Sequence, residues 1–364
     1  MHGNKKISAL QLYFVLMLSI GITNHVILIP ALLQNGKRDS WIGAAAAVVP
    51  LVIWVLLLYM LIKKTAHQRI MDWLKIRFGR FTSGLCMLIV IGVCVIDAIV
   101  TLKDIVIWTH VSYLPQSPSW TINLVFMIFC FFAALAGLRA IAITAGILLP
   151  GVVFLGLLVM SANFHYKDYG MLTPLFTHGY EPAMTSMILT CGASFEMISI
   201  IFIQHHVSTR IRLSSLLILA LVLLILTIGP LTGAIAIFGP FEAADLRYPA
   251  FEQWRMVTMG KYISHLDFLS IYQWISGACI RMSLLLFLIL DTIGVQKKQN
   301  RTMVLFGFSL FFFVLGLIPV DDNLILKQIE TWYYPSMFGV GVCMLFVLLL
   351  LSMLPAKSKE SERK

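Results

Sequence analysis

The stretch TCGASFEMISI, residues 190–200, places the carboxylate of Glu196 inside a long run of apolar residues, shortly after Gly192 and Ser194. Glycine disfavours a continuous helix, and a serine hydroxyl competes for backbone hydrogen bonds. The positive end of a broken helix can receive a carboxylate, and a nearby acidic side chain can receive an ammonium group. This stretch therefore has the chemistry to bind a small molecule that carries both charges.

A second polar stretch, LSIGITNHVILIP (18–30), interrupts the first apolar run of the chain. Backbone groups freed at a helix break need partners, and a substrate or ion can supply them. We expect both glycines to give a ligand access to bare backbone; the alternative is that they only allow membrane helices to pack closely. The predicted ligand-binding residues are Gly21, Thr23, Asn24, His25, Gly192, Ser194 and Glu196.

Two further ionisable residues, Asp97 and Arg281, also fall deep inside apolar runs. Such residues are costly in a membrane, so they usually face the bundle interior and find a partner. We predict that Arg281 pairs with Asp97 or with Glu196, as an intramembrane ion pair or gate. The alternative is a buried network that only fixes helix packing. Asp97, Thr101 and Asp104 share one helix face by their spacing, and Asp104 is expected near the outer end, reaching for the interface.

The remaining polar residues indicate no catalytic or metal centre. His205 and His206 precede Arg210, and Asp291 precedes Lys297, so these groups are assigned to the membrane interface. The cysteines follow no metal-ligand spacing and no disulfide is expected. No nucleophile elbow, phosphate loop or catalytic triad is present in the sequence. We therefore predict no enzyme activity, no metal and no cofactor.

The composition requires a membrane. The chain has 364 residues, of which 59% are hydrophobic and 12% charged, with a mean hydropathy of +0.90. Helices of about 20 apolar residues cross a bilayer. We predict one transmembrane domain over residues 1–364, with ten spans and a tail at 355–364. The spans are expected at about 8–33, 41–62, 81–108, 120–138, 141–162, 184–204, 214–238, 268–293, 302–319 and 334–354.

Lysine and arginine concentrate in the connections on one side of these spans, which by the positive-inside rule places both termini in the cytoplasm. The net charge of +10 reflects this bias and not nucleic-acid binding. Two further segments are predicted as helices at the membrane surface: residues 65–80 on the cytoplasmic side and 249–265 on the outer side.

Ten spans divide into two sets of five of opposite orientation, at about 8–162 and 184–354, which is the arrangement of an inverted repeat. In such folds the first helix of each half is broken near the midplane. The sequence offers a break in each of these helices, at 20–24 and at 191–195. We therefore expect both polar stretches to meet at one central site.

Several stretches resemble the spore-germination receptor B-subunit family, the GerAB-type permeases of endospore-forming bacteria, within the amino acid–polyamine–organocation transporter superfamily. The matching stretches are ISALQLYFVLMLSIGIT (7–23), GKRDSWIGAAAAVV (36–49), SFEMISIIFI (194–203) and the long segment from Leu246 to Phe287. The chain departs from the family where His265 and Leu266 precede Asp267, a place where family members often carry an arginine.

The resemblance implies a nutrient sensor, usually for amino acids, in the inner membrane of the spore. It also implies a complex with a receptor A subunit and a lipoprotein C subunit. The alternative is a working secondary transporter that moves an amino acid together with a proton. Both functions use the same kind of binding site, so the site residues do not separate them.

Overall fold

The computed structural model describes residues 6–65, 67–177, 179–258, 265–295 and 297–354; the predicted tail at 355–364 lies outside them. The described ranges are helical almost throughout and contain no β-strand, only an isolated bridge between Ile7 and Val207. The α-helices are α1 Ala9–Ile22, α2 Leu28–Gly36, α3 Ser40–Ala46, α4 Val48–Thr65, α5 Ile70–Phe78, α6 Arg80–Ser112, α7 Ser119–Ala136, α8 Leu138–Ala162, α9 Glu181–Ser194, α10 Ser199–Ile203, α11 Leu213–Phe238, α12 Pro240–Asp245, α13 Pro249–Arg255, α14 Leu269–Ile293, α15 Lys298–Leu317, α16 Asp322–Gln328 and α17 Tyr334–Met353.

The all-α membrane fold predicted from composition is confirmed. Within the described residues, nine helical runs are long and apolar enough to cross a membrane. The first of them, Ala9–Thr65, divides where Lys37 adopts φ 44° and ψ −118° and α2 gives way to a short 3-10 turn before α3. The count of ten spans and the inverted repeat remain predictions.

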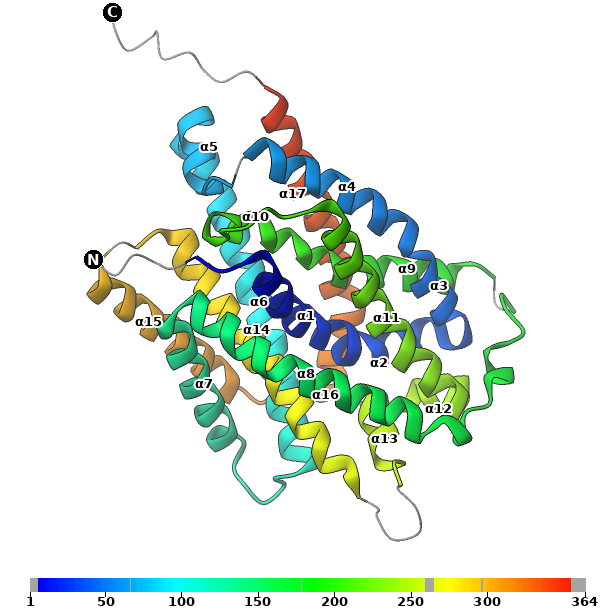
Figure 1. Ribbon diagram of the computed structural model, residues 1–364. Coiled ribbons are helices and arrows are strands. Elements are labelled where there is room, and N and C mark those ends of the chain that lie inside the picture. Colours follow the sequence, from blue (N-terminus) through cyan, green and yellow to red (C-terminus); the bar gives the residue numbers. More distant parts are fainter. Residues whose placement is uncertain (1–5, 66, 178, 259–264, 296, 355–364) are drawn as a thin grey trace, which may run out of the picture.

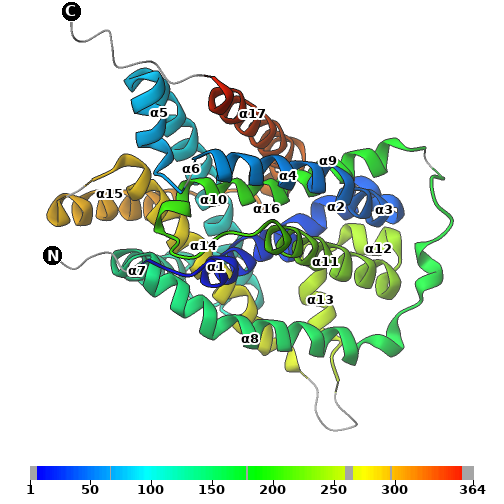
Figure 2. The same cartoon turned by 45° about the horizontal axis from the view of Figure 1, so that its top comes forward.

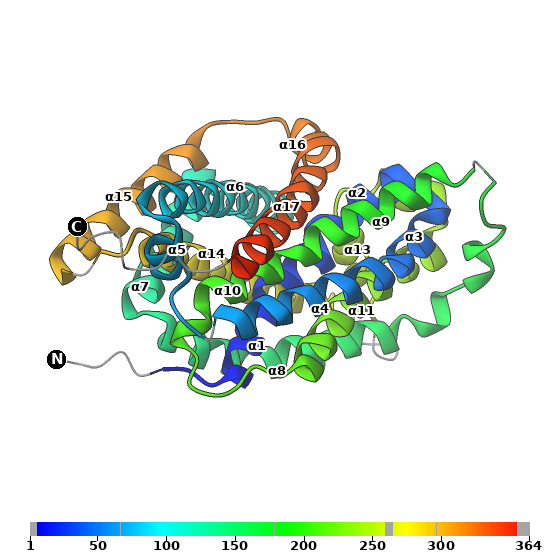
Figure 3. The ribbon, with the colours of Figure 1, turned by 90° about the horizontal axis from the view of Figure 1, so that it is seen from above.

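Helix α14 lies at the centre of the bundle. It packs against α1, α6 and α8, and Figure 1 shows it, in yellow, between α6 and α8. In the turned view of Figure 2, α8 runs beneath α1 and α14. Seen from above in Figure 3, α5, α7 and α15 gather on one side of the bundle, and α2, α3 and α9 on the other. Arg281 and Ser283, in the middle of α14, are therefore buried.

Both predicted helix breaks are present as changes of helix type. Helix α1 is followed by a π-helical turn, Thr23–Ile27, and α9 by a 3-10 turn, Phe195–Ile198. Each lies a few residues beyond the predicted position. The chain does not unwind at either place, which corrects the expectation of bare backbone. Local π and 3-10 turns re-pair most of the backbone groups that an open break would leave without partners in lipid.

The two predicted surface helices have different outcomes. Helix α5 forms within 65–80 and buries Ile70 and Trp73, while Ile76 is exposed; its place at the membrane interface remains a prediction. The helix predicted over 249–265 is shorter, since α13 ends at Arg255, and residues 259–264 lie outside the described ranges. Its aromatic side chains are buried in the bundle and do not lie along the membrane surface.

The burial of α13 has a local cause. The Trp254 indole donates a hydrogen bond to Gln273 Oε1 of α14 at 2.8 Å, and Phe251 packs edge-on against Trp108 of α6. These contacts draw α13 into the bundle. Arg255 pairs with Glu252 of the same helix.

Candidate functional site

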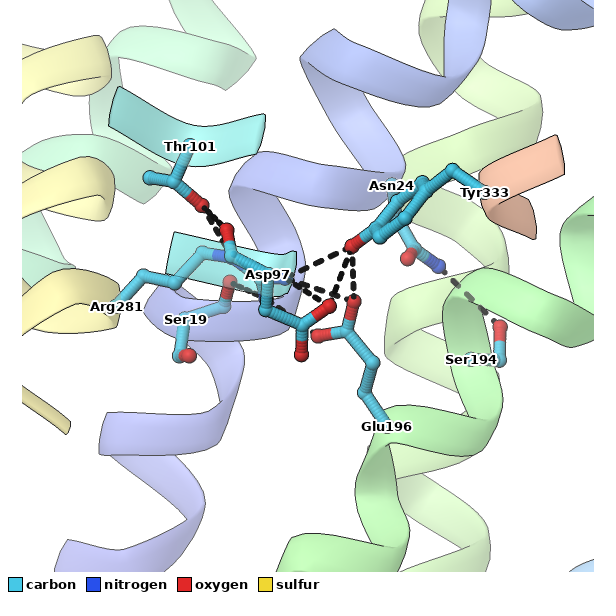
Figure 4. A network of polar contacts seen from close by, with 8 residues as sticks. All are labelled: Ser19, Asn24, Asp97, Thr101, Ser194, Glu196, Arg281 and Tyr333. Atoms are coloured by element: carbon cyan, nitrogen blue, oxygen red, sulfur yellow. Dashed lines mark hydrogen bonds and ion pairs between the residues drawn. The ribbon is translucent and has the colours of Figure 1, made fainter. Parts of the chain in front are cut away.

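Arg281 of α14 is the best-connected charged residue in the membrane-spanning part of the structure, and it is 1% exposed. Its Nε donates to Thr101 Oγ1 of α6 at 2.8 Å. Its Nη1 donates to the backbone carbonyl of Ser19 in α1 at 3.1 Å. Figure 4 shows the side chain reaching between these two helices. Two of the three guanidinium nitrogens are thus bound by α6 and α1, apart from any acidic partner.

The change of helix type after α1 explains why the Ser19 carbonyl is available. The N–H of Thr23 bonds to the carbonyl of Ile20, and not to that of Ser19, its usual partner in an α-helix. The freed carbonyl accepts a hydrogen bond from Arg281. The sequence predicted that a break in this helix would expose a backbone group to a ligand; in the structure a side chain of the protein occupies that group.

Glu196 forms a two-pronged ion pair with Arg281. Its Oε1 accepts from Nη2 at 2.9 Å, and its Oε2 accepts from Nη1. The glutamate lies in the 3-10 turn that follows α9. Parallel hydrogen bonds of this kind fix geometry as well as charge. The pair therefore ties the interruption after α9 to the middle of α14.

Asp97 of α6 and Tyr333 complete the cluster. The Tyr333 hydroxyl donates to Asp97 Oδ1 at 2.7 Å and accepts from Arg281 Nη2 at 3.3 Å. Asp97 Oδ1 lies 3.6 Å from the same guanidinium nitrogen. The structure thus brings Arg281 into contact with both carboxylates that the sequence offered as alternatives. One guanidinium faces two carboxylates.

A cavity of about 60 Å³ adjoins this cluster. Arg281, Glu196 and Asp97 contribute to its wall, together with apolar side chains of α6, α14 and α17. Such a volume holds roughly four to six water molecules. The arrangement offers a small ligand one cation and two carboxylates in a space that is otherwise apolar.

Gly192 lines the cavity but also packs tightly. A Cβ built on it would collide with the carbonyl oxygen of Tyr334 at the start of α17. The close approach of α9 and α17 therefore requires glycine here, whatever the ligand. The alternative offered for Gly192, that it allows membrane helices to pack closely, therefore describes its structural role.

Asn24 and Ser194 contact each other away from the ion pair. Asn24 Nδ2 donates to Ser194 Oγ and to the Leu223 carbonyl, each at 3.3 Å, as Figure 4 shows for the serine. Thr23 is fully buried, and its hydroxyl has no hydrogen-bond partner among the described residues. These residues join the two interrupted spans to each other and do not line the cavity at Arg281.

Gly21 and His25 line a different cavity, of about 260 Å³, between α1, α8, α11, α13 and α14. His25 Nδ1 donates to the Leu226 carbonyl at 3.2 Å. Neither residue lines the cavity at Glu196. The predicted single site is therefore divided: one set of residues lies at the ion pair and the other across α1.

Sequence reasoning missed Tyr333. It ends a second π-helical turn, Ile329–Tyr333, directly before α17. A tyrosine at the start of an apolar span is typical of the membrane interface, so its position concealed its role. Asp104 also differs from expectation, since it is buried and pairs with Arg247 at 3.3 Å and does not reach for the interface. The arginine that holds it lies far along the chain, between α12 and α13.

The structure also gathers residues that the sequence assigned separately to the interface. His205, His206 and Asp291 lie close enough together to hold a metal ion. They belong to different spans, so no ligand spacing along the chain signals them.

Three comparisons relate the chain to known proteins. A family model described as spore germination protein matches residues 6–325. The chain is 38% identical over 350 residues to spore germination protein XB of Bacillus anthracis, which covers 96% of this chain and 98% of that protein. The solved structure of MhsT in complex with L-phenylalanine matches with a TM-score of 0.66 at 14% identity, covering 98% of this chain and 94% of that one.

The identity to MhsT is low, so that comparison shows a shared transporter fold alone. The family match and the curated relative agree over nearly the whole chain. Together with the apolar helices, they make this an integral membrane protein of permease type and not an enzyme. The chain belongs to the spore permease family of spore germination proteins.

Proposed function

We propose that this chain is the membrane subunit of a nutrient-germinant receptor and that it binds a small amino acid at the Arg281–Glu196 pair. The observation that carries the proposal is the two-pronged, buried pair at the edge of a cavity. Ionisable residues at such depth are costly and are usually functional. Family membership supports the role in germination.

An amino acid fits this site by its charges. Its carboxylate would compete with Glu196 for Arg281, and its ammonium group would take Glu196 or Asp97 as partner. Binding would then open the Arg281–Glu196 pair, and the helices that carry the two residues would report occupancy. MhsT, which shares the fold, was solved with L-phenylalanine, and this favours amino acids as the ligand class.

A change caused by ligand binding in this chain must pass to other subunits of the receptor. We propose an assembly with a receptor A subunit and a lipoprotein C subunit in the inner membrane of the spore, with both termini of this chain in the cytoplasm. The basic connections of the sequence support this orientation.

A second candidate function is secondary transport of an amino acid coupled to a proton. Two carboxylates facing one guanidinium favour it, because the second carboxylate has no cation of its own and is a place to hold a proton. The transporter fold also favours it.

A ligand-stabilisation screen tests the site. The purified chain is heated with amino acids, sugars and nucleosides, in wild-type form and as Glu196→Gln. Glu181→Gln is a matched control, because Glu181 is exposed at the start of α9, the helix that ends just before the turn with Glu196. We expect one or a few amino acids to raise the melting temperature of the wild type and the control but not of Glu196→Gln. Stabilisation by sugars or nucleosides alone would contradict the ligand class.

A further inference from the structure

A second polar cluster lies beyond the ion pair on the same two segments of the chain. His206 is ten residues after Glu196, and Asp291 is ten residues after Arg281. Helical rise places this level roughly 15–20 Å from the ion pair. The two segments therefore make polar contact twice, once at the cavity and once at their ends.

The cluster converges on one carboxylate. His205 Nε2 lies 3.2 Å from Asp291 Oδ2, and His206 Nε2 lies 3.0 Å from Asp291 Oδ1. The histidine rings pack together with centroids 4.0 Å apart, and His206 rests edge-on against Phe287. Each of the three side chains is 16% exposed, so water and ions can reach a cluster that is otherwise enclosed.

The donor set suits a particular class of ion. One ligand atom from each of the three residues lies within 4.8 Å of the other two. Zinc binds imidazole nitrogen and carboxylate oxygen at about 2.0–2.2 Å in a tetrahedral arrangement, so a modest contraction of the cluster is enough. Two imidazoles favour zinc and its neighbours over magnesium or calcium, which prefer oxygen ligands.

Both imidazoles present Nε2 to the carboxylate of Asp291, so these nitrogens can face a shared metal ion. Nδ1 of His205 is buried without a hydrogen-bond partner among the described residues, so no contact at Nδ1 fixes its tautomer. A bound metal would replace the hydrogens that now lie between the imidazoles and the carboxylate.

The surrounding backbone holds the cluster in place. The N–H of Ile7 donates to the His206 carbonyl at 3.0 Å, which ties the segment before α1 to this level. Arg69 donates to the carbonyl oxygens of Asp291 and Thr292 at the end of α14. The ligands thus sit on backbone anchored from two further parts of the chain, as a preorganised site requires.

We propose that His205, His206 and Asp291 form a binding site for a transition-metal ion of the zinc class, which joins the end of the α9–α10 span to the end of α14. The site does not depend on the proposed amino acid ligand, and each can be tested without the other.

The test uses the full chain, purified without a histidine tag and stripped of metal. Zinc is titrated against a chromophoric chelator, and cobalt is added separately to follow its visible absorption. We expect one equivalent of zinc to bind and cobalt to give the strong visible bands of a four-coordinate site. Magnesium should not displace cobalt.

Variants locate the ion. His206→Gln and Asp291→Asn should each weaken zinc binding by at least roughly tenfold, since even residues that only support a metal ligand have effects of this size. His165→Gln is the matched control, because His165 is exposed in the short turn after α8, and it should bind as the wild type does.

Two results would overturn the proposal. One is the absence of stoichiometric zinc binding by the folded wild type, as expected if protons alone bridge the three side chains. The other is unchanged affinity in both variants. Elution volume in size-exclusion chromatography checks that each variant is folded. If a variant is not folded, the cobalt spectrum of the wild type decides whether a four-coordinate metal site is present.

Discussion

At the scale of the residue, Arg281 is bound to partners from four parts of the chain: α1, α6, the turn after α9 and the turn before α17. Losing the guanidinium would leave Glu196 and Asp97 buried together without a cation. Losing the charge of Glu196 would leave Arg281 with Asp97 and Tyr333. The two substitutions are therefore not equivalent.

Arg281→Met should reduce the stability of the protein by about 3–5 kcal/mol, the usual cost of leaving a buried charge unpaired. Glu196→Gln should cost clearly less, because Asp97 still faces the guanidinium. Thermal unfolding followed by size-exclusion chromatography measures both. Equal losses for the two variants, or a stable Arg281→Met, would contradict this network.

The acidic and basic members of this cluster could be predicted from the sequence. Charged residues deep in apolar runs must find partners, and that rule selects Asp97, Glu196 and Arg281. The rule does not identify Tyr333, because tyrosine is common at the ends of membrane spans. The rule also does not show that Gly21 and Glu196 line different cavities. The side of α1 on which each residue lies depends on how the helices pack.

At the scale of the element, the interrupted spans position the site. The π turn after α1 frees the Ser19 carbonyl for Arg281, and the 3-10 turn after α9 contains Glu196. Glycine and hydroxyl residues indicated where each interruption would occur. They could not indicate its form, because a π turn, a 3-10 turn and an open break all follow from the same weakening of the α-helix.

Gly192→Ala should destabilise the protein by about 1–3 kcal/mol, because its methyl group would push α9 away from the Tyr334 carbonyl. Gly339→Ala in α17 is the matched control: a Cβ there meets nothing within 4 Å, and alanine improves helix propensity. Melting temperatures of the two variants make the comparison. A neutral Gly192→Ala would show that α9 and α17 are not in close contact.

At the scale of the whole molecule, α14 is the central helix, carrying Arg281 at the cavity and Asp291 near its end. The composition predicted a membrane bundle, and most span boundaries lie within a few residues of those expected. The central position of α14 was not predictable, because its apolar pattern resembles that of the spans around it. Burial is a property of the assembled helices.

The sensor function makes a prediction for the chain as a whole. Reconstituted alone in liposomes, it should bind a radiolabelled amino acid without accumulating it, with or without an imposed pH gradient. Filtration of the liposomes measures both quantities. Accumulation well beyond one molecule per protein, increased by a gradient, would favour the transporter.

The most direct test of the central claim is an equilibrium binding isotherm with radiolabelled amino acids, measured on the purified wild type, Glu196→Gln and the Glu181→Gln control. If an amino acid binds by inserting between Arg281 and Glu196, the wild type and Glu181→Gln should share one saturable isotherm. Glu196→Gln should lose at least tenfold in affinity, about 1.4 kcal/mol, while remaining folded. Binding of equal affinity to folded Glu196→Gln would contradict the site.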